Sequence, residues 1–201
     1  MKTLLFLIVA TSLFLFSCKN NSGSSSKSAD SENTATTGKD GFYFKYTLDG
    51  KEMQVDAADI SSTYYPDQNN RFAIFAGKED GVKLLLTVSQ DMTKPSVTPS
   101  GSNDPKMNIQ QGSVSLQNYP EKNYTSNSYN STYPEKTPVI TDAIIITGSE
   151  KDGEEARIIT GTFNANTYSD NKETDAKNAD HVVKGKFRIK HAFSSFNGGK
   201  F

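Results

Sequence analysis

Alternation of apolar and polar residues dominates the chain from Phe42 onward. In Phe42–Leu48 (FYFKYTL) apolar side chains take every second position, and Asp49-Gly50 follows directly. An Asp-Gly pair between alternating runs is typical of a tight β-hairpin, because both central residues of its turn need positive φ. The returning strand runs from Met53 to Ala57. We therefore predict that the folded part of the chain begins with a hairpin.

Further runs of the same kind follow, and most are separated by short turns. The predicted hairpins and strands are Arg71–Gly77 with Val82–Ser89, Val139–Gly148 with Glu155–Ala165, the weaker Ser113–Asn118, and a final strand at His181–Phe193. No window shows a sustained helical period of apolar residues. The pattern predicts an all-β, antiparallel fold of about eight strands, either a sandwich or a small barrel.

The first forty residues have a different character. Leu4–Phe16 is a continuous apolar run after Lys2, shorter than the roughly 20 residues of a membrane-spanning helix, and it is typical of a secretory signal. Asn20–Asp40 holds mainly Ser, Thr, Asn and Gly, so it cannot bury enough apolar surface to offset its ordering entropy. We predict a signal peptide at 1–17, a cysteine and flexible tether at 18–40, and one domain at 41–201.

The end of the apolar run, Leu15-Phe16-Ser17-Cys18, resembles a bacterial lipobox, although Phe16 stands where a small or aliphatic residue is usual. The resemblance implies that Cys18 becomes the N-terminus, carries acyl chains such as palmitate and anchors the protein in a membrane. Several acyl chains anchor stably, whereas one binds only marginally. The alternative is an ordinary secretory signal with an incidental cysteine.

The residues after the cysteine bear on sorting by the same resemblance. Lys19 stands where aspartate retains enterobacterial lipoproteins in the inner membrane, and this favours the outer membrane. Surface-exposed lipoproteins of the Bacteroidota often carry an acidic cluster there, which this chain lacks. We expect the domain to face the periplasm, with surface exposure as the alternative.

Two short motifs extend the resemblance to the domain. Gly161-Thr162-Phe163 lies in one predicted strand and Gly185-Lys186-Phe187 in the last one, after an opening Asp49-Gly50 hairpin. This combination resembles small uncharacterised lipoprotein domains of the Bacteroidota, over about Phe42–Phe193. The resemblance implies location and fold, and it supplies no catalytic residues.

Charge and cysteine content exclude several classes of protein. The chain has 22 Lys and Arg against 23 Asp and Glu, whereas a general nucleic-acid binder is clearly basic. Its single cysteine excludes a disulfide framework and a multi-cysteine zinc site. The expected partners are therefore the membrane, through Cys18, and an envelope protein or glycan, with no nucleic acid.

The last predicted strand separates its residues by parity. One face carries the cations Lys184, Lys186, Arg188 and Lys190. Four cations on one strand face are a candidate site for an anionic partner. The alternative is a solvated face whose lysines protect an edge strand from aggregation.

The most unusual segment is Asn118–Pro138, where Tyr-Pro-Glu-Lys occurs twice among Asn, Ser and Thr. Its tyrosines are Tyr119, Tyr124, Tyr129 and Tyr133. Such a mixture is typical of binding loops, in which rigid aromatic contacts sit among adaptable polar ones. We predict that this loop contacts the partner, with the polar segment Asp91–Gln111 as a second long loop. The alternative is that the tyrosines fold back over the sheet edge.

Chemistry finds little support in the sequence. His181 and His191 are about 33 Å apart along a regular strand, too far to share a metal. Asp170–Asp175 offers oxygen ligands suited to calcium, but it lacks the glycine of the helix-loop-helix motif and contains Lys172, so a solvated loop is favoured. No hydrolase, metalloprotease or phosphate-loop motif is present. We predict no metal, no cofactor and no catalysis.

The sequence therefore predicts a non-enzymatic, membrane-anchored binding or adaptor module. The first alternative is a β-barrel carrier of a small apolar ligand, and the second is a hydrolase without a visible motif. Bulky residues at the expected inward positions, such as Phe44, Leu86 and Phe187, are suited to filling a barrel rather than lining a cavity.

Overall fold

The computed structural model describes residues 41–101, 111–121, 124–132, 138–169, 178–194 and 198–200, with backbone only at 121 and 124–127. Strands account for most of these residues. They are β1 (Tyr43–Leu48), β2 (Lys51–Val55), β3 (Ile60–Tyr65), β4 (Arg71–Ala76), β5 (Lys83–Ser89), β6 (Ser96–Ser100), β7 (Ser113–Glu121), β8 (Tyr124–Asn130), β9 (Ile140–Lys151), β10 (Ala156–Ser169) and β11 (His181–Ala192). A single 3-10 turn, η1 (Ala57–Asp59), precedes β3.

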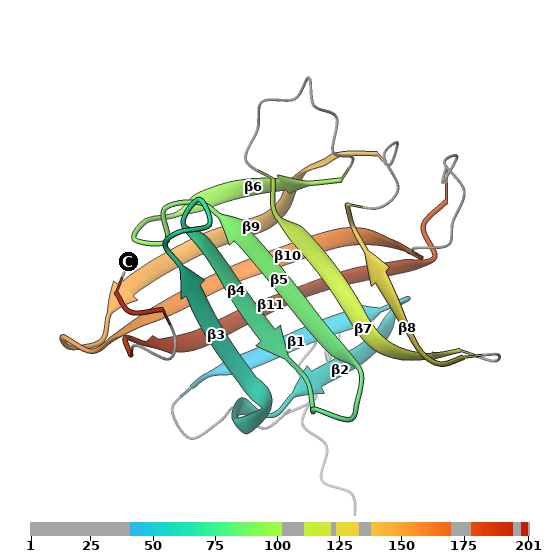
Figure 1. Ribbon diagram of the computed structural model, residues 1–201, viewed down its shortest axis with the longest axis horizontal. Coiled ribbons are helices and arrows are strands. Elements are labelled where there is room, and N and C mark those ends of the chain that lie inside the picture. Colours follow the sequence, from blue (N-terminus) through green and yellow to red (C-terminus); the bar gives the residue numbers. More distant parts are fainter. Residues whose placement is uncertain are drawn as a thin grey trace, which may run out of the picture. The chain divides into compact units, whose positions relative to one another are not determined.

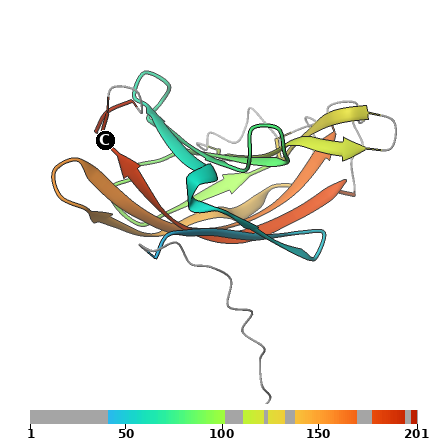
Figure 2. The same ribbon diagram turned by 90° about the horizontal axis from the view of Figure 1, so that it is seen from below.

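All of these strands belong to one antiparallel sheet of 11 strands, so the predicted all-β fold is confirmed. The sheet is bent into two layers whose strands run in clearly different directions (Figures 1 and 2). One layer, sheet A, has the order β2-β1-β11-β10-β9-β6, and the other, sheet B, has the order β3-β4-β5-β7-β8. The result is a nearly closed barrel-like arrangement with more strands than the predicted number.

The two layers are joined at β10, the longest strand. One edge of β10 pairs with β11 from Ala156 to Thr167. Its other edge pairs first with β9, over Arg157–Phe163, and then with β8 through Tyr168 and Ser169. The register on the β9 side shifts between Thr160 and Gly161, because β9 has one extra residue, Thr147, opposite this step. This strand therefore belongs to both layers.

The three predicted hairpins are all present. The first turns at Asp49 and Gly50, whose φ angles are 51° and 82°, as an Asp-Gly turn with two left-handed residues requires. The other two are β4–β5 and β9–β10. These three pairs could be predicted from the sequence because their turns are short and their apolar and polar residues alternate strongly.

Three strands lie where no strand was predicted. They are β3, β6 within the predicted loop Asp91–Gln111, and β8 within the predicted loop Asn118–Pro138. In β6 the usual pattern is inverted, because Val97 is 53% exposed while Thr98 and Ser100 are buried. Polar side chains on the inward face concealed this strand.

The core lies between the two layers. Its largest fully buried side chains are Tyr129, Tyr168, Phe44, Phe72, Phe187, Ile74, Leu84, Leu86, Met92, Leu116, Ile144 and Ile146. In sheet A the ring of Phe44 is centred 5.4 Å from Phe163 and 6.0 Å from Phe187. Each such side chain contributes about 2 kcal/mol to stability through the apolar surface that it removes from water.

The paired Gly-x-Phe motifs have a structural explanation. Gly161 on β10 lies opposite Phe187 on β11, and Phe163 lies opposite Gly185. Each glycine thus leaves room for the phenylalanine of the neighbouring strand. A Cβ atom on Gly185 would lie 2.5 Å from both the Lys45 carbonyl oxygen and Cζ of Phe163. In both motifs the phenylalanine ring packs against the backbone of the glycine on the neighbouring strand.

Candidate functional site

The β7–β8 hairpin extends beyond the strands beside it (Figure 2). Pairing of β7 with β5 ends at Gln117, and pairing of β8 with β10 involves only Tyr129 and Asn130. We call the part from Asn118 to Glu121 on β7, with Tyr124 to Asn127 on β8, the arm. Within the described residues, the two strands of the arm pair only with each other. Both outer edges of the arm therefore offer backbone groups to a partner.

The base of the arm is held by aromatic and polar contacts. The ring of His181 is centred 4.4 Å from Tyr119 and 4.5 Å from Tyr129, and these two tyrosines form an edge-to-face pair. Asn118 has a left-handed φ of 55°, and its amide nitrogen donates to the Gly81 carbonyl oxygen at 3.3 Å. These contacts tie the start of the arm to the rest of sheet B and to β11.

These positions change the interpretation of the four tyrosines. Tyr129 is 1% exposed and packs in the core, so the prediction that it contacts a partner is wrong for this structure. Tyr119 is partly buried and packs against the core. Tyr124 lies on the arm, although its side chain is outside the described atoms, and Tyr133 is outside the described residues. Two of the four tyrosines thus brace the arm from within.

A hydrogen-bonded aspartate–histidine pair lies beside this base. Asp49 Oδ2 is 2.7 Å from His181 Nδ1, and Asp49 Oδ1 accepts a hydrogen bond from the Val182 amide. Partial burial raises the pKa of the Asp49 carboxyl, but the hydrogen bonds from His181 and Val182 outweigh it and hold the pKa below its ordinary value. The β1–β2 turn is thereby fastened to the start of β11.

The predicted cations of β11 lie on the outer face of sheet A. Lys184, Lys186 and Lys190 are exposed and Arg188 is partly exposed. Because β11 lies between β1 and β10, the interpretation that its lysines protect an edge strand is wrong. Lys190 forms an ion pair with Asp152 at 2.8 Å, which separates it from the other three.

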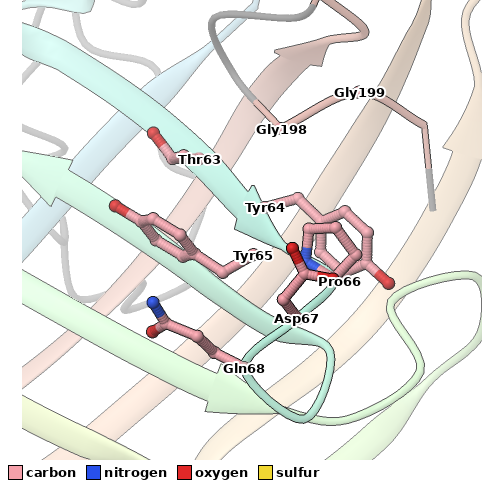
Figure 3. Close-up of a pocket in the computed structure, with 8 residues that line it drawn as sticks. All are labelled: Thr63, Tyr64, Tyr65, Pro66, Asp67, Gln68, Gly198 and Gly199. Carbon is pink, nitrogen blue, oxygen red and sulfur yellow. The ribbon is translucent and has the colours of Figure 1, made fainter.

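An open pocket of about 470 Å³ lies at the end of β3 (Figure 3). Figure 3 shows the Tyr64 ring beside Pro66, with Gly198 and Gly199 running past Tyr64. The Tyr64 hydroxyl donates to Asn70 Oδ1 at 2.7 Å. Asp67 is the one carboxylic acid among the lining residues, which include no lysine, arginine or histidine. We assign no chemistry to this pocket.

A serine and a histidine meet behind this pocket. His191 Nδ1 is 3.0 Å from Ser62 Oγ, and His191 Nε2 is 3.4 Å from the Gly199 carbonyl oxygen. The geometry fits a neutral ring that accepts from the serine hydroxyl and donates to the carbonyl. Ser62 is 5% exposed and His191 is fully buried between Phe72 and Phe193. The pair is therefore placed as a buried link between β3 and β11 rather than as a nucleophile open to substrate.

We expect stability to depend on pH through His191. Burial lowers the pKa of His191, and the hydrogen bond to Gly199 offsets this only in part. Below about pH 6.5 the unfolded chain therefore binds a proton that the folded chain excludes. Stability should fall as pH decreases from there to the depressed folded-state pKa, by at most about 1.4 kcal/mol per pH unit. Urea unfolding of the wild type and of His191→Gln between neutral and mildly acidic pH measures this slope, which the variant should lack.

The described part of the chain has neither a cluster of metal-binding side chains nor a membrane-spanning helix. It holds no group of three or more His, Cys, Asp or Glu side chains that could bind a metal ion. It also holds no helix with the length and apolar character needed to cross a membrane. The calcium candidate Asp170–Asp175 and the lipobox-like Cys18 lie outside the described residues.

Comparisons with known proteins add no identity. No protein-family model matches the chain, and neither the curated proteins nor the solved structures contain a match. Its function is therefore inferred from its own residues and their geometry.

Proposed function

We propose that the chain is a lipid-anchored lipoprotein of a bacterial cell envelope that acts without catalysis, as a binding or adaptor module for an envelope protein or glycan. The anchor is Cys18, and the domain faces the periplasm from the outer membrane. The lipobox-like Leu15–Cys18 and the Ser-rich stretch after it support this assignment. We further propose that the domain is related to the small lipoprotein domains of the Bacteroidota, which its Gly-x-Phe motifs resemble.

The observation that carries the binding role is the arm. An isolated two-stranded hairpin is at best marginally stable, and here Tyr119 and Tyr129 support the base of the arm. The arm is therefore suited to contacting a partner rather than to packing within the domain. Its outer edges, which pair with no other strand of the described residues, can accept an extended segment of a partner as a further strand. Its Asn, Ser and Tyr content matches that of adaptable binding surfaces.

Two further observations favour surface binding over the alternatives. Fully buried side chains such as Phe44, Leu86 and Phe187 fill the space between the layers, which favours surface binding over carriage of an apolar ligand. Ser62 and His191 form the described Ser-His pair, and both are buried, which disfavours a hydrolase built on them.

A photocrosslinking experiment tests the role of the arm. A photoreactive amino acid replaces Pro120, which is exposed on the arm, or Asp80, which is exposed in the β4–β5 turn on sheet B. We expect irradiation of intact cells to give a discrete adduct from position 120 and none from position 80. Equal adducts from both positions, or none from either, would contradict the proposal. Incorporation of labelled palmitate that is lost in Cys18→Ala tests the anchor separately.

A further inference from the structure

Four cations gather on the outer face of sheet A. Three of them lie on β11, and the fourth lies on β1. Lys45 on β1 lies directly opposite Lys186 on β11. Lys184 and Arg188 stand two residues before and after Lys186, about 6.6 Å away along the strand. We call these four residues the cationic patch. It spans β1 and β11, the first and the last described strands, which are neighbours in sheet A.

No ion pair neutralises the cationic patch in the described part of the domain. Among the described residues, none of the four forms an ion pair, and Glu52, diagonal to Lys45 on β2, forms none with it. The outward residues beside the patch on β10 are Thr160, Thr162 and Asn164. Like charges placed directly opposite each other across a strand pair are destabilising. On a chain with a net charge of −1, this is a local concentration of positive charge rather than general basicity.

The chain enters the domain at this patch. The described residues begin at Gly41, and the ring of Phe42 lies 5.9 Å from the Arg188 guanidinium carbon. The stretch 18–40 precedes it, and its composition predicts a tether with a reach on the order of 25 Å. The described chain therefore starts beside the cationic patch, and a tether from Cys18 allows this face to reach the bilayer.

We propose that the cationic patch lies against the anionic lipid headgroups of the membrane in which Cys18 is anchored. This inference rests on the proposed lipid anchor. Each cation close to an anionic bilayer raises partitioning about fivefold, so four are too few for stable binding alone. The tether supplies the missing affinity, because it holds the domain at a high effective concentration beside the bilayer. Docking on sheet A leaves the loops and turns of sheet B directed away from the membrane.

A lysine footprint on the complete processed protein tests the inference. The acylated chain is reconstituted into vesicles of phosphatidylcholine, or of phosphatidylcholine with about 30% phosphatidylglycerol, and briefly acetylated. We expect acetylation of Lys45, Lys184 and Lys186 to slow at least about fivefold in the anionic vesicles, and about 0.5 M salt to restore it. Lys78 and Lys83, which flank the β4–β5 turn on sheet B, should change less than about twofold.

A matched pair of variants assigns the effect to the patch. Lys45→Gln with Lys186→Gln removes two charges from the patch, and Lys78→Gln with Lys83→Gln removes two from sheet B. Lys184 remains in both variants as the reporter. We expect its protection on anionic vesicles to be lost in the first variant and kept in the second. Equal protection in the two variants would overturn the inference.

The outcomes separate this inference from the proposed anchor. The intact mass of the purified chain reports whether Cys18 is acylated. If it is acylated and Lys184 reacts equally on both kinds of vesicle, the docking inference fails while the anchor stands. If it is not acylated, the anchor fails, and the docking inference that rests on it fails with it. Protection in native membranes but not on protein-free anionic vesicles assigns the patch to an acidic protein or glycan and overturns the inference.

Discussion

Replacing Gly185 with alanine should destabilise the domain by about 3 kcal/mol, because the added methyl group has no space. Its Cβ atom would lie 2.5 Å from the Lys45 carbonyl oxygen, a backbone atom held by the β1–β11 pairing, and 2.5 Å from the Phe163 ring. Neither the backbone nor the buried ring can move without disturbing the core. For a domain of this length the melting temperature should fall by about 9 °C.

Gly148 provides the matched control for this prediction. It also lies in sheet A, but a Cβ atom there would meet its nearest neighbour, Thr160, at an ordinary 3.7 Å. Gly148→Ala should therefore change stability by less than about 0.5 kcal/mol, since it adds no clash. Thermal unfolding followed by circular dichroism measures both variants. Equal melting temperatures for the two would refute the packing explanation of the Gly-x-Phe motifs.

Phe187→Ala should cost about 4 kcal/mol, the largest effect that we expect from a single side-chain truncation in this domain. The ring is fully buried, stacks on Phe44 at 6.0 Å and covers the bare backbone of Gly161. Its removal leaves a cavity between the layers that the surrounding strands can close only in part. The melting temperature should fall by about 12 °C.

Phe75 offers the same substitution on the opposite side of a strand. It is partly exposed on the outer face of β4, so Phe75→Ala should cost about 1 kcal/mol or less. Urea denaturation of both variants gives the comparison. A cost for Phe75→Ala that equals or exceeds the cost for Phe187→Ala would show that the space between the layers is not the main source of stability.

The strands that could be predicted from the sequence are those whose inward positions are bulky and whose turns are short. Phe44, Tyr46 and Leu48 before Asp49-Gly50 are the clearest case. In β3 the inward Ser62 interrupts the apolar pattern. It can be buried there because it forms a hydrogen bond with His191 on β11, far along the chain. In β6 the apolar residue Val97 faces outward. Local patterns cannot reveal strands whose inward residues are satisfied by partners far along the chain.

The same limit applies to the candidate sites. The four cations of β11 were visible as a parity pattern, but Lys45 joins three of them only through the register between β1 and β11. The spacing of tyrosines in Asn118–Pro138 was visible too, yet it could not show that Tyr129 turns inward and packs beside His181. The sequence shows which residue types are present, whereas the residues that come together in space are determined by long-range strand pairing.

The pairing of β1 with β11 also sets an order of assembly. The strands of sheet B follow one another along the chain, so each can join its neighbour as soon as that neighbour has been made. In sheet A, β1 has only β2 as a partner until β11, the last described strand, arrives. During synthesis from the N-terminal end, the β1–β2 hairpin must therefore wait, with one edge open, until β11 has been made. Sheet A is completed late, and any chain that stops short of His181 leaves this hairpin without its neighbour.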